Sequence, residues 1–254
     1  MRASELLRPD WPAPDTVLAA VTTRNGGCSE GEFAGLNMAL HVGDAESSVR
    51  RNRKLAADAF APDAQFQWLR QVHGSEPAIV FQSGEAPEAD SLISSAPGIA
   101  LCVLTADCLP IFVCNRAGDE VGIIHAGWRG MSAGIIENTL AAMCSEPEDL
   151  LIWLGPAIQS CHYEVGEDVR EAFLDCAANT REQQQFKAAF APLKKQGKYY
   201  ADLPQIARIK LHRLGAASIS GGTHCTYSDA SRFYSHRRDG LCGRMANLIC
   251  INPA

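Results

Sequence analysis

Two histidines and a cysteine occupy places in the sequence where side chains could bind a metal ion. His73 precedes a glycine, Cys108 lies in the segment TADCLP at 105–110, and His125 opens the segment HAGWRG at 125–130. Together they would form a His₂Cys zinc site, whose three protein ligands leave a fourth position for water or substrate. Zinc at such a site supplies hydroxide or polarises a substrate oxygen. The spacings of 35 and 17 residues match no compact zinc finger, so the alternative of strand-end histidines and a core thiol stays open.

A basic cluster near the C-terminus could bind phosphate. Residues 231–240 have the sequence SRFYSHRRDG, and Gly243-Arg244 follows closely. Guanidinium groups bind phosphate through paired hydrogen bonds, and the ring of Phe233 or Tyr234 could stack on a base. An equally balanced alternative is a solvated turn with Arg–Asp pairs, which contribute little to stability.

A second polar region lies near the N-terminus. It combines the segment TTRNGG at 22–27 with Asn37 and with HVGD at 41–44. Its glycines indicate tight turns that could bring the backbone close to a ligand. Arg24, Asn37 and His41 are therefore candidate substrate-binding residues.

Two short segments match catalytic motifs but lack other features that those motifs require. The segment GMSAG at 130–134 matches the nucleophile elbow of serine hydrolases, but an elbow needs its serine directly between strand and helix. We expect Ser132 to be a helix N-cap instead. The segment HYE at 162–164 matches half of a nucleobase deaminase signature, but no P-C-x-x-C follows it.

The elements that must position these residues alternate along the chain. Apolar runs predict buried strands at 99–104, 121–124 and 150–154, and a further strand at 217–220. Apolar residues at helical spacing predict helices at 132–143, 165–176 and 203–214. The most linker-like stretches, 85–88 and 181–185, are short. This alternation favours one α/β or α+β domain over residues 1–254.

Composition excludes several classes of protein. The 254 residues contain 23 Lys and Arg against 29 Asp and Glu, a formal net charge of −6, which disfavours a nucleic-acid binder with a broad basic face. No apolar run is long enough to span a membrane, and the start MRASELLRPDW has no apolar leader. The ten cysteines form no CxxC pair. We expect a cytoplasmic protein with reduced thiols, most of them small buried hydrophobes.

Taken in order, these segments resemble one family. The matching motifs, from about residue 17 to 250, are TRNGGCS, LNMALHVGD, RNR, RQVHG, ADCLPI, HAGWRG, GPAI, CHYEVG, FYSHRRDG and GR. They are similar to those of the bacterial multicopper polyphenol oxidase or laccase-domain family, which includes the YfiH-type purine nucleoside phosphorylases. The resemblance implies a single-domain layered sandwich with a mixed β-sheet and flanking helices. It also implies zinc bound by His73, Cys108 and His125.

Members of that family are described as enzymes that phosphorolyse adenosine, inosine, guanosine and methylthioadenosine and that deaminate adenosine. The resemblance therefore implies a purine nucleoside and phosphate as partners. Our mechanistic hypothesis assigns five catalytic residues: Asp107, Arg129, Glu164, Arg237 and Arg238. In it the arginines orient phosphate, Asp107 orients a histidine ligand or moves protons, and Glu164 handles protons in deamination. The substrate-binding candidates are Arg24, Asn37, His41, Phe233 and His236.

Three alternatives remain. Older descriptions make the family copper-dependent polyphenol oxidases, but several copper centres would need roughly ten histidines, since copper relies on imidazole ligands. The chain has 7 histidines, which leaves room for copper only at the single His₂Cys site. Cys108 could instead be the nucleophile of a hydrolase that cleaves amides such as cell-wall precursors. A non-catalytic protein that binds purine nucleotides is the third alternative.

Overall fold

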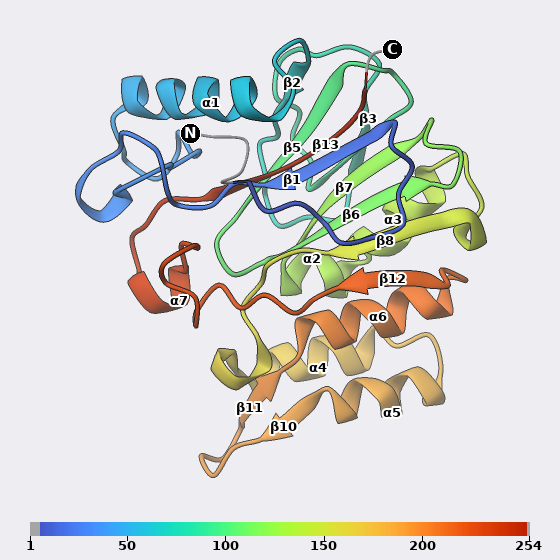
Figure 1. Ribbon diagram of the computed structural model, residues 1–254. Helices are drawn as coiled ribbons and strands as arrows, with labels where there is room; N and C mark the ends of the chain where they lie inside the picture. The colour runs from blue at the N-terminus through green and yellow to red at the C-terminus, as the bar shows by residue number, and fades with distance from the viewer. Residues whose placement is uncertain (1–5, 253–254) are drawn as a thin grey trace.

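The computed structural model describes residues 6–252, and residues 1–5, on which part of the leader-peptide expectation rests, lie outside this range. Its core consists of two mixed β-sheets that pack face to face (Figure 1). The first sheet has the order β12 (Ser218–Gly221), β8 (Leu150–Leu154), β6 (Leu109–Asn115), β7 (Val121–Ala126), β4 (Ser91–Ser94) and β3 (Pro77–Ile79). The second has the order β1 (Val17–Val21), β13 (Met245–Ile251), β5 (Ile99–Thr105) and β2 (Gln65–Gln67).

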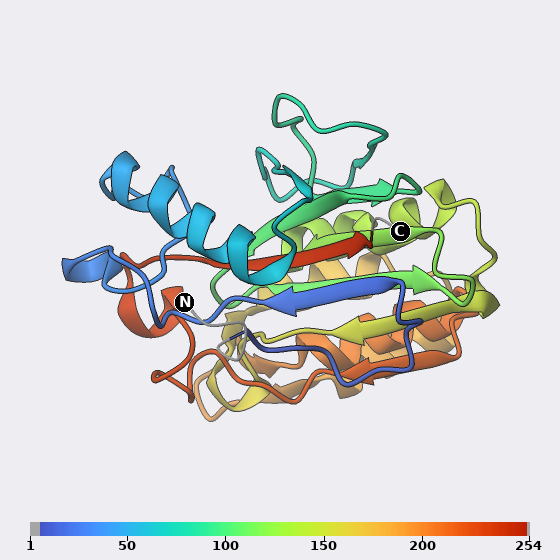
Figure 2. The ribbon, with the colours of Figure 1, turned by 45° about the horizontal axis from the view of Figure 1, so that its top comes forward.

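Helices cover the outer faces of both sheets. Figure 2 shows α1 on the outer side of one sheet and most of the other helices beyond the other sheet. The helices are α1 (Glu46–Phe60), α2 (Trp128–Ala133), α3 (Ile135–Ala142), α4 (Glu167–Asp175), α5 (Thr180–Ala188), α6 (Leu203–Arg213) and α7 (His236–Asp239). A small third sheet of β10 (Phe190–Pro192), β11 (Lys198–Ala201) and β9 (Glu164–Gly166) lies beside α4 and α5, and short 3₁₀ turns occupy Gly31–Phe33, Pro147–Asp149 and Ser160–His162.

The strands are apolar on both sides because each sheet is covered on both faces. In β6, Phe112 and Cys114 pack between the two sheets, whereas Ile111 and Val113 pack under the helices. In β5 the same alternation places Leu101 between the sheets and Cys102 under α1. The result is a helix–sheet–sheet–helix sandwich, which confirms the expected mixed α/β architecture.

The predicted strands are confirmed, and so are the helices at 165–176 and 203–214, apart from their exact ends. The predicted helix at 132–143 is wrong in its start. Helix α2 begins at Trp128, directly after β7, and Gly134 with φ 99° separates it from α3. The Ser132 hydroxyl donates to the carbonyl of Arg129 and caps no helix. The stretch 181–185 belongs to α5 and is no linker.

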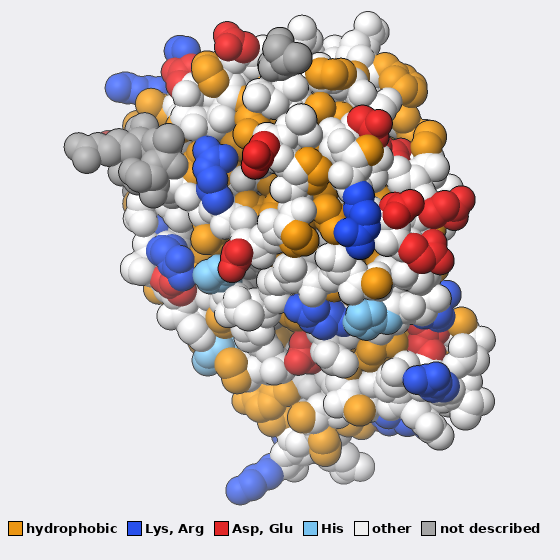
Figure 3. Space-filling model, turned by 45° about the vertical axis from the view of Figure 1, so that its right-hand side comes forward, with side chains coloured by type: hydrophobic (Ala, Val, Ile, Leu, Met, Phe, Trp, Pro, Cys, Tyr) orange, Lys and Arg blue, Asp and Glu red, His pale blue; other side chains and the backbone are white. Residues whose placement is uncertain are grey.

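No helix within residues 6–252 is both long enough and apolar enough to cross a membrane. On the face seen in Figure 3, acidic side chains and patches of uncharged surface separate most of the basic ones.

Candidate metal centre and its surroundings

The three predicted metal ligands meet at one end of the six-stranded sheet. Cys108 lies in the connection between β5 and β6, His125 lies in β7 beside β6, and His73 comes from the loop before β3. Their ligand atoms all lie within 4.8 Å of one another, and Cys108 Sγ is 4.0 Å from His73 Nε2. A zinc ion with bonds of about 2.0–2.3 Å to nitrogen and sulfur could reach all three, so the donor set fits a single ion.

Asp90 holds one of these ligands in place. Its buried carboxylate accepts a hydrogen bond from His125 Nδ1 at 2.7 Å and further bonds from the backbone N–H groups of Val72 and Gly74. Burial works against the charged carboxylate, but the bond from His125 and the two backbone bonds keep the pKa of Asp90 below its usual value. The arrangement fixes the tautomer of His125 and leaves Nε2 for a metal. The histidine-orienting role expected of Asp107 therefore belongs to Asp90.

The neighbouring histidines favour the thiolate form of Cys108. Burial alone would raise the pKa of the Cys108 thiol, but the charge and hydrogen bond of His125, together with His73, lower it to about 6. Burial lowers the pKa of His125, but the Cys108 thiolate and Asp90 outweigh that effect and raise it to about 9. Cys108 is thus a thiolate near neutral pH, which is the form that binds metal.

The backbone at the site is strained. Within residues 6–252, the only non-glycine residues with positive φ are His73, at 59°, and Asp107, at 90°. Such conformations are unfavourable for side-chain-bearing residues and persist only where surrounding contacts enforce them. For His73 the enforcing contact is Asp90, which binds the N–H groups on either side of it.

Asp107 joins the metal loop to the C-terminal segment. Its Oδ1 accepts from the Thr226 hydroxyl at 2.6 Å, and its Oδ2 accepts from the backbone N–H of Arg237 at 2.7 Å. These two bonds hold the segment around α7 against the metal loop, so Asp107 is arranged to position α7. Arg237 extends from there, donates to the carbonyl of Glu164 at 2.8 Å and lies 5.2 Å from the centre of the Tyr163 ring.

Arg129 and Tyr163 complete the polar surroundings. Arg129 is exposed at the start of α2 and lies 4.3 Å from the centre of the Trp128 ring. Burial, followed by the Cys108 thiolate, raises the pKa of the Tyr163 hydroxyl, so that it remains a proton donor. The charges of Arg237 and Arg129 act on the same hydroxyl. The sequence assigned no role to Tyr163 or Asp90, because both act on neighbours that are distant in the chain.

Arg238 has a structural position. Its guanidinium donates to the carbonyls of Thr226, Tyr227 and Phe233, and its bond to Asp239 raises its pKa. With these donors occupied, Arg238 ties α7 to the preceding loop. Its N–H groups are therefore not available to bind phosphate, unlike those of Arg129 and Arg237.

Two of the five substrate-binding candidates are buried, and the others make contacts of their own. Phe233 and Asn37 have no exposed surface, so neither side chain can touch a substrate in this conformation. Arg24 stacks 4.8 Å from the centre of the Tyr234 ring, and His236 bonds through Nδ1 to the carbonyl of Gly240. The side chain of His41 is partly exposed, and its partial desolvation, followed by the charges of Arg244 and Arg53, lowers its pKa. Arg24 and Asn37 join the N-terminal loops to the C-terminal segment, through the carbonyl of Ala230 and the backbone N–H of Arg244 respectively.

The remaining cysteines only partly follow expectation. All ten are free thiols. Cys102, Cys114, Cys242 and Cys250 are buried as expected, whereas Cys144 is exposed, because it lies in the turn after α3. Of the ten cysteines, only Cys108 belongs to a cluster with two histidines that could hold a metal ion.

Gly127 leaves the space that the three ligands use. A Cβ at this position would lie 3.1 Å from His73 Cδ2 and 3.2 Å from Cys108 Sγ, although the backbone, with φ −69°, accepts any residue. Gly127→Ala is therefore expected to displace both ligands slightly and weaken metal binding by roughly tenfold. Metal titration followed by absorbance or calorimetry measures the effect. Gly84→Ala, whose Cβ would meet nothing within 4 Å, is the matched control. Unchanged affinity in Gly127→Ala would show that the trio does not bind the metal here.

Comparison with known proteins places the chain among close relatives. The family model described as multi-copper polyphenol oxidoreductase laccase matches residues 18–252. A protein of Escherichia coli K12 named purine nucleoside phosphorylase YfiH is 43% identical over 251 residues, covering 98% of this chain and 99% of the relative. A purine nucleoside phosphorylase of Pseudomonas aeruginosa is 42% identical over 96% of this chain and 98% of its own length.

Solved structures share the architecture. A Neisseria meningitidis protein superposes with a TM-score of 0.91 at 41% identity, covering 98% of this chain and all of that one (100%). YlmD from Geobacillus stearothermophilus superposes with a TM-score of 0.89 at 32% identity, covering 100% of this chain and 98% of that one. The sandwich is thus a fold already known from crystal structures.

Proposed function

Because this chain belongs to the multi-copper polyphenol oxidoreductase laccase family, and because relatives at 42–43% identity over nearly its full length are named purine nucleoside phosphorylases, we propose that it cleaves purine nucleosides with phosphate. The products would be the free purine base and ribose 1-phosphate. The observation that carries the proposal is the His₂Cys trio beside Tyr163, whose hydroxyl lies near enough to Cys108, Arg237 and Arg129 to be affected by their charges.

We propose zinc as the metal. The thiolate and two imidazoles are ligands that zinc prefers, and at such a centre zinc activates water or polarises an oxygen. Within residues 6–252 this trio is the only group of three or more His, Cys, Asp or Glu side chains whose ligand atoms could hold one ion. A multicopper oxidase requires several such centres, and this favours the phosphorylase over phenol oxidation.

The side chains around the trio suit an anionic substrate. We assign Arg129 and Arg237 to phosphate, because guanidinium groups at a partly water-excluded site stabilise the negative charge of the nucleophile and hold it in line for attack. Tyr163 would donate a hydrogen bond to the nucleoside or to phosphate. Asp107 would act as a positioning residue, since it holds the backbone N–H of Arg237. We further propose that the chain deaminates adenosine with water to inosine and ammonia, with Glu164, an exposed residue whose backbone carbonyl accepts from Arg237, as the candidate proton carrier.

The products of adenosine decide between these activities. With phosphate, the zinc-loaded protein is expected to release adenine and ribose 1-phosphate, and without phosphate no adenine should form. Inosine formed under either condition reports deamination. Chromatography of the reaction mixture measures all of these products.

A His73→Ala variant, purified in the same way, controls for a contaminating host phosphorylase, because His73 is exposed and its substitution is expected to disturb the fold little. Release of adenine without phosphate, or the same release by His73→Ala, would contradict the proposal. If adenosine, inosine, guanosine and methylthioadenosine all give no product, a non-catalytic binding protein is favoured.

A cysteine hydrolase is the second candidate. It is favoured by the lowered pKa of Cys108, about 6, beside His125, which is the pairing of an activated thiolate with a base. Alkylation distinguishes the zinc-dependent phosphorylase from the cysteine hydrolase. If Cys108 is a zinc ligand, iodoacetamide should modify it in metal-free protein and spare it when zinc is bound.

A further inference from the structure

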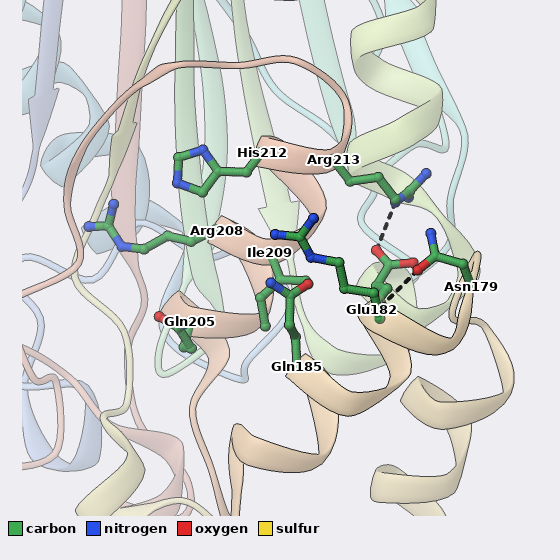
Figure 4. A pocket seen from close by; sticks show the side chains of 9 residues that line it. Asn179, Glu182, Gln185, Gln205, Arg208, Ile209, His212 and Arg213 are labelled. Atoms are coloured by element: carbon green, nitrogen blue, oxygen red, sulfur yellow. Dashed lines mark hydrogen bonds and ion pairs between the residues drawn. The ribbon is translucent and has the colours of Figure 1, made fainter.

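A cavity of about 370 Å³ lies between α5 and α6, built entirely from residues outside the metal centre. Its walls are Asn179, Arg181, Glu182, Gln185, Gln205, Arg208, Ile209, His212 and Arg213. Figure 4 shows Arg208 and His212 on one side, Arg213 and Glu182 on the other, and Ile209 with Gln185 between them. Its volume falls in the range of small-molecule sites.

The lining is strongly positive for a chain of net charge −6. It contains three arginines and one histidine against a single carboxylate, Glu182. That carboxylate is already engaged, because Glu182 Oε1 accepts from Arg213 Nε at 2.7 Å and Oε2 accepts from the backbone N–H of Ala178 at 2.6 Å. It therefore neutralises Arg213 and leaves the other two arginines of the cavity without a counter-charge.

Arg208 is held in place without being neutralised. Its Nη1 donates to the carbonyl of Ile219 at 3.0 Å and its Nη2 to the carbonyl of Gly221 at 2.7 Å, both in β12. These bonds orient the guanidinium but leave its full positive charge. Next to it, His212 bonds through Nδ1 to the carbonyl of Ala216, which leaves Nε2 for another partner.

The fold itself does not account for a positive charge at Arg181. It lies in the first turn of α5, where the helix dipole disfavours a cation, and within residues 6–252 no carboxylate pairs with it or with Arg208. By contrast, His212 and Arg213 lie in the last turn of α6, where positive charge is favourable. Arg181 is also exposed at the rim and can turn inward onto a ligand.

We propose that this cavity binds a small phosphate monoester of the sugar phosphate type. A phosphate group of about two negative charges would be neutralised by Arg181 and Arg208, with His212 as a further donor. The side-chain amides of Gln185 and Gln205 would bond the hydroxyls of the sugar, above Ile209 as the apolar floor. The proposal is independent of the reaction at the metal centre, since the two sites share no residue.

Isothermal titration with ribose 5-phosphate tests the proposal. Wild type and Arg129→Ala, which lacks a phosphate contact proposed at the metal centre, should bind it alike. Arg181→Ala should weaken binding by tenfold or more, because a charge-assisted hydrogen bond contributes about 1.5–3 kcal/mol. Gln205→Glu, nearly identical in shape, should abolish binding by placing a negative charge in the cavity. Lys187→Ala, which removes a cation from the same helix outside the cavity, is the matched control and should change affinity less than twofold.

Results of three kinds would overturn the proposal. The first is equal affinity of Arg181→Ala and wild type, with both showing the same thermal unfolding midpoint. The second is loss of binding in Arg129→Ala but not in Arg181→Ala, which would assign the binding to the metal centre. The third is the absence of binding at millimolar ribose 5-phosphate, or equal binding of ribose, which carries no phosphate.

Discussion

His125→Ala is expected to remove the metal and the turnover of purine nucleosides together. The substitution leaves two ligands of three, and the ion's contribution to catalysis, several kcal/mol, corresponds to a fall in turnover of about a thousandfold. Metal content by mass spectrometry of the purified protein and product formation from adenosine with phosphate measure the two effects on the same sample.

The fold of that variant needs a parallel test. His125 is buried, and its removal leaves the buried Asp90 carboxylate without its partner. This loss destabilises the protein independently of any loss of metal. His73→Ala removes an exposed ligand with no such partner and should cause the same loss of metal and turnover in a fully stable protein. Cys144→Ser, which changes an exposed thiol elsewhere, should leave both unchanged. Full turnover in a metal-free His125→Ala or His73→Ala protein would refute the role of the trio.

Asp90→Asn is expected to weaken metal binding by about 10- to 100-fold, as the loss of a partner that orients a histidine ligand does. The carboxylate accepts three hydrogen bonds, from His125, Val72 and Gly74, and an amide can accept on only one of its two atoms. Losing these bonds should also lower stability by roughly 1–3 kcal/mol, because a buried donor is left unpaired. Metal titration and thermal unfolding measure the two effects separately.

The effect of Asp90 acts through the metal, and added zinc should therefore restore most of the turnover of Asp90→Asn. Glu88→Gln is the matched control: it neutralises a carboxylate two residues earlier whose partner, Arg70, is exposed, and such pairs contribute about 0–1 kcal/mol. If turnover falls in Asp90→Asn while zinc affinity stays that of wild type, Asp90 acts in the chemistry itself and the positioning role is wrong.

Local patterns predicted the parts of the site that depend on single elements. The strands at 99–104 and 121–124 are apolar on both faces because both faces are buried. Cys108, in the connection after the first strand, and His125, near the end of the second, meet at one end of the six-stranded sheet. The start of α2 was misplaced, because the helix follows β7 after only Gly127, and no turn-forming segment marks the change. Helix α1 was not predicted at all, since its sequence is largely polar and even its buried face, Val49, Asn52, Ala56 and Phe60, contains an asparagine and a small alanine.

The sequence by itself identified His73, Cys108 and His125 as candidate metal ligands, because a thiol and two imidazoles are few in number and specific in chemistry, and the fold brings the three together. It could not decide which acids and arginines serve them, because any carboxylate is chemically equivalent until its neighbours are known. Asp90 rather than Asp107 orients His125, Arg238 binds backbone carbonyls rather than facing the site, and Phe233 is buried. The cavity between α5 and α6 likewise exists only where two helices distant from the metal loops meet. Such pairings depend on directions and distances between segments far apart in the chain, which only tertiary packing sets.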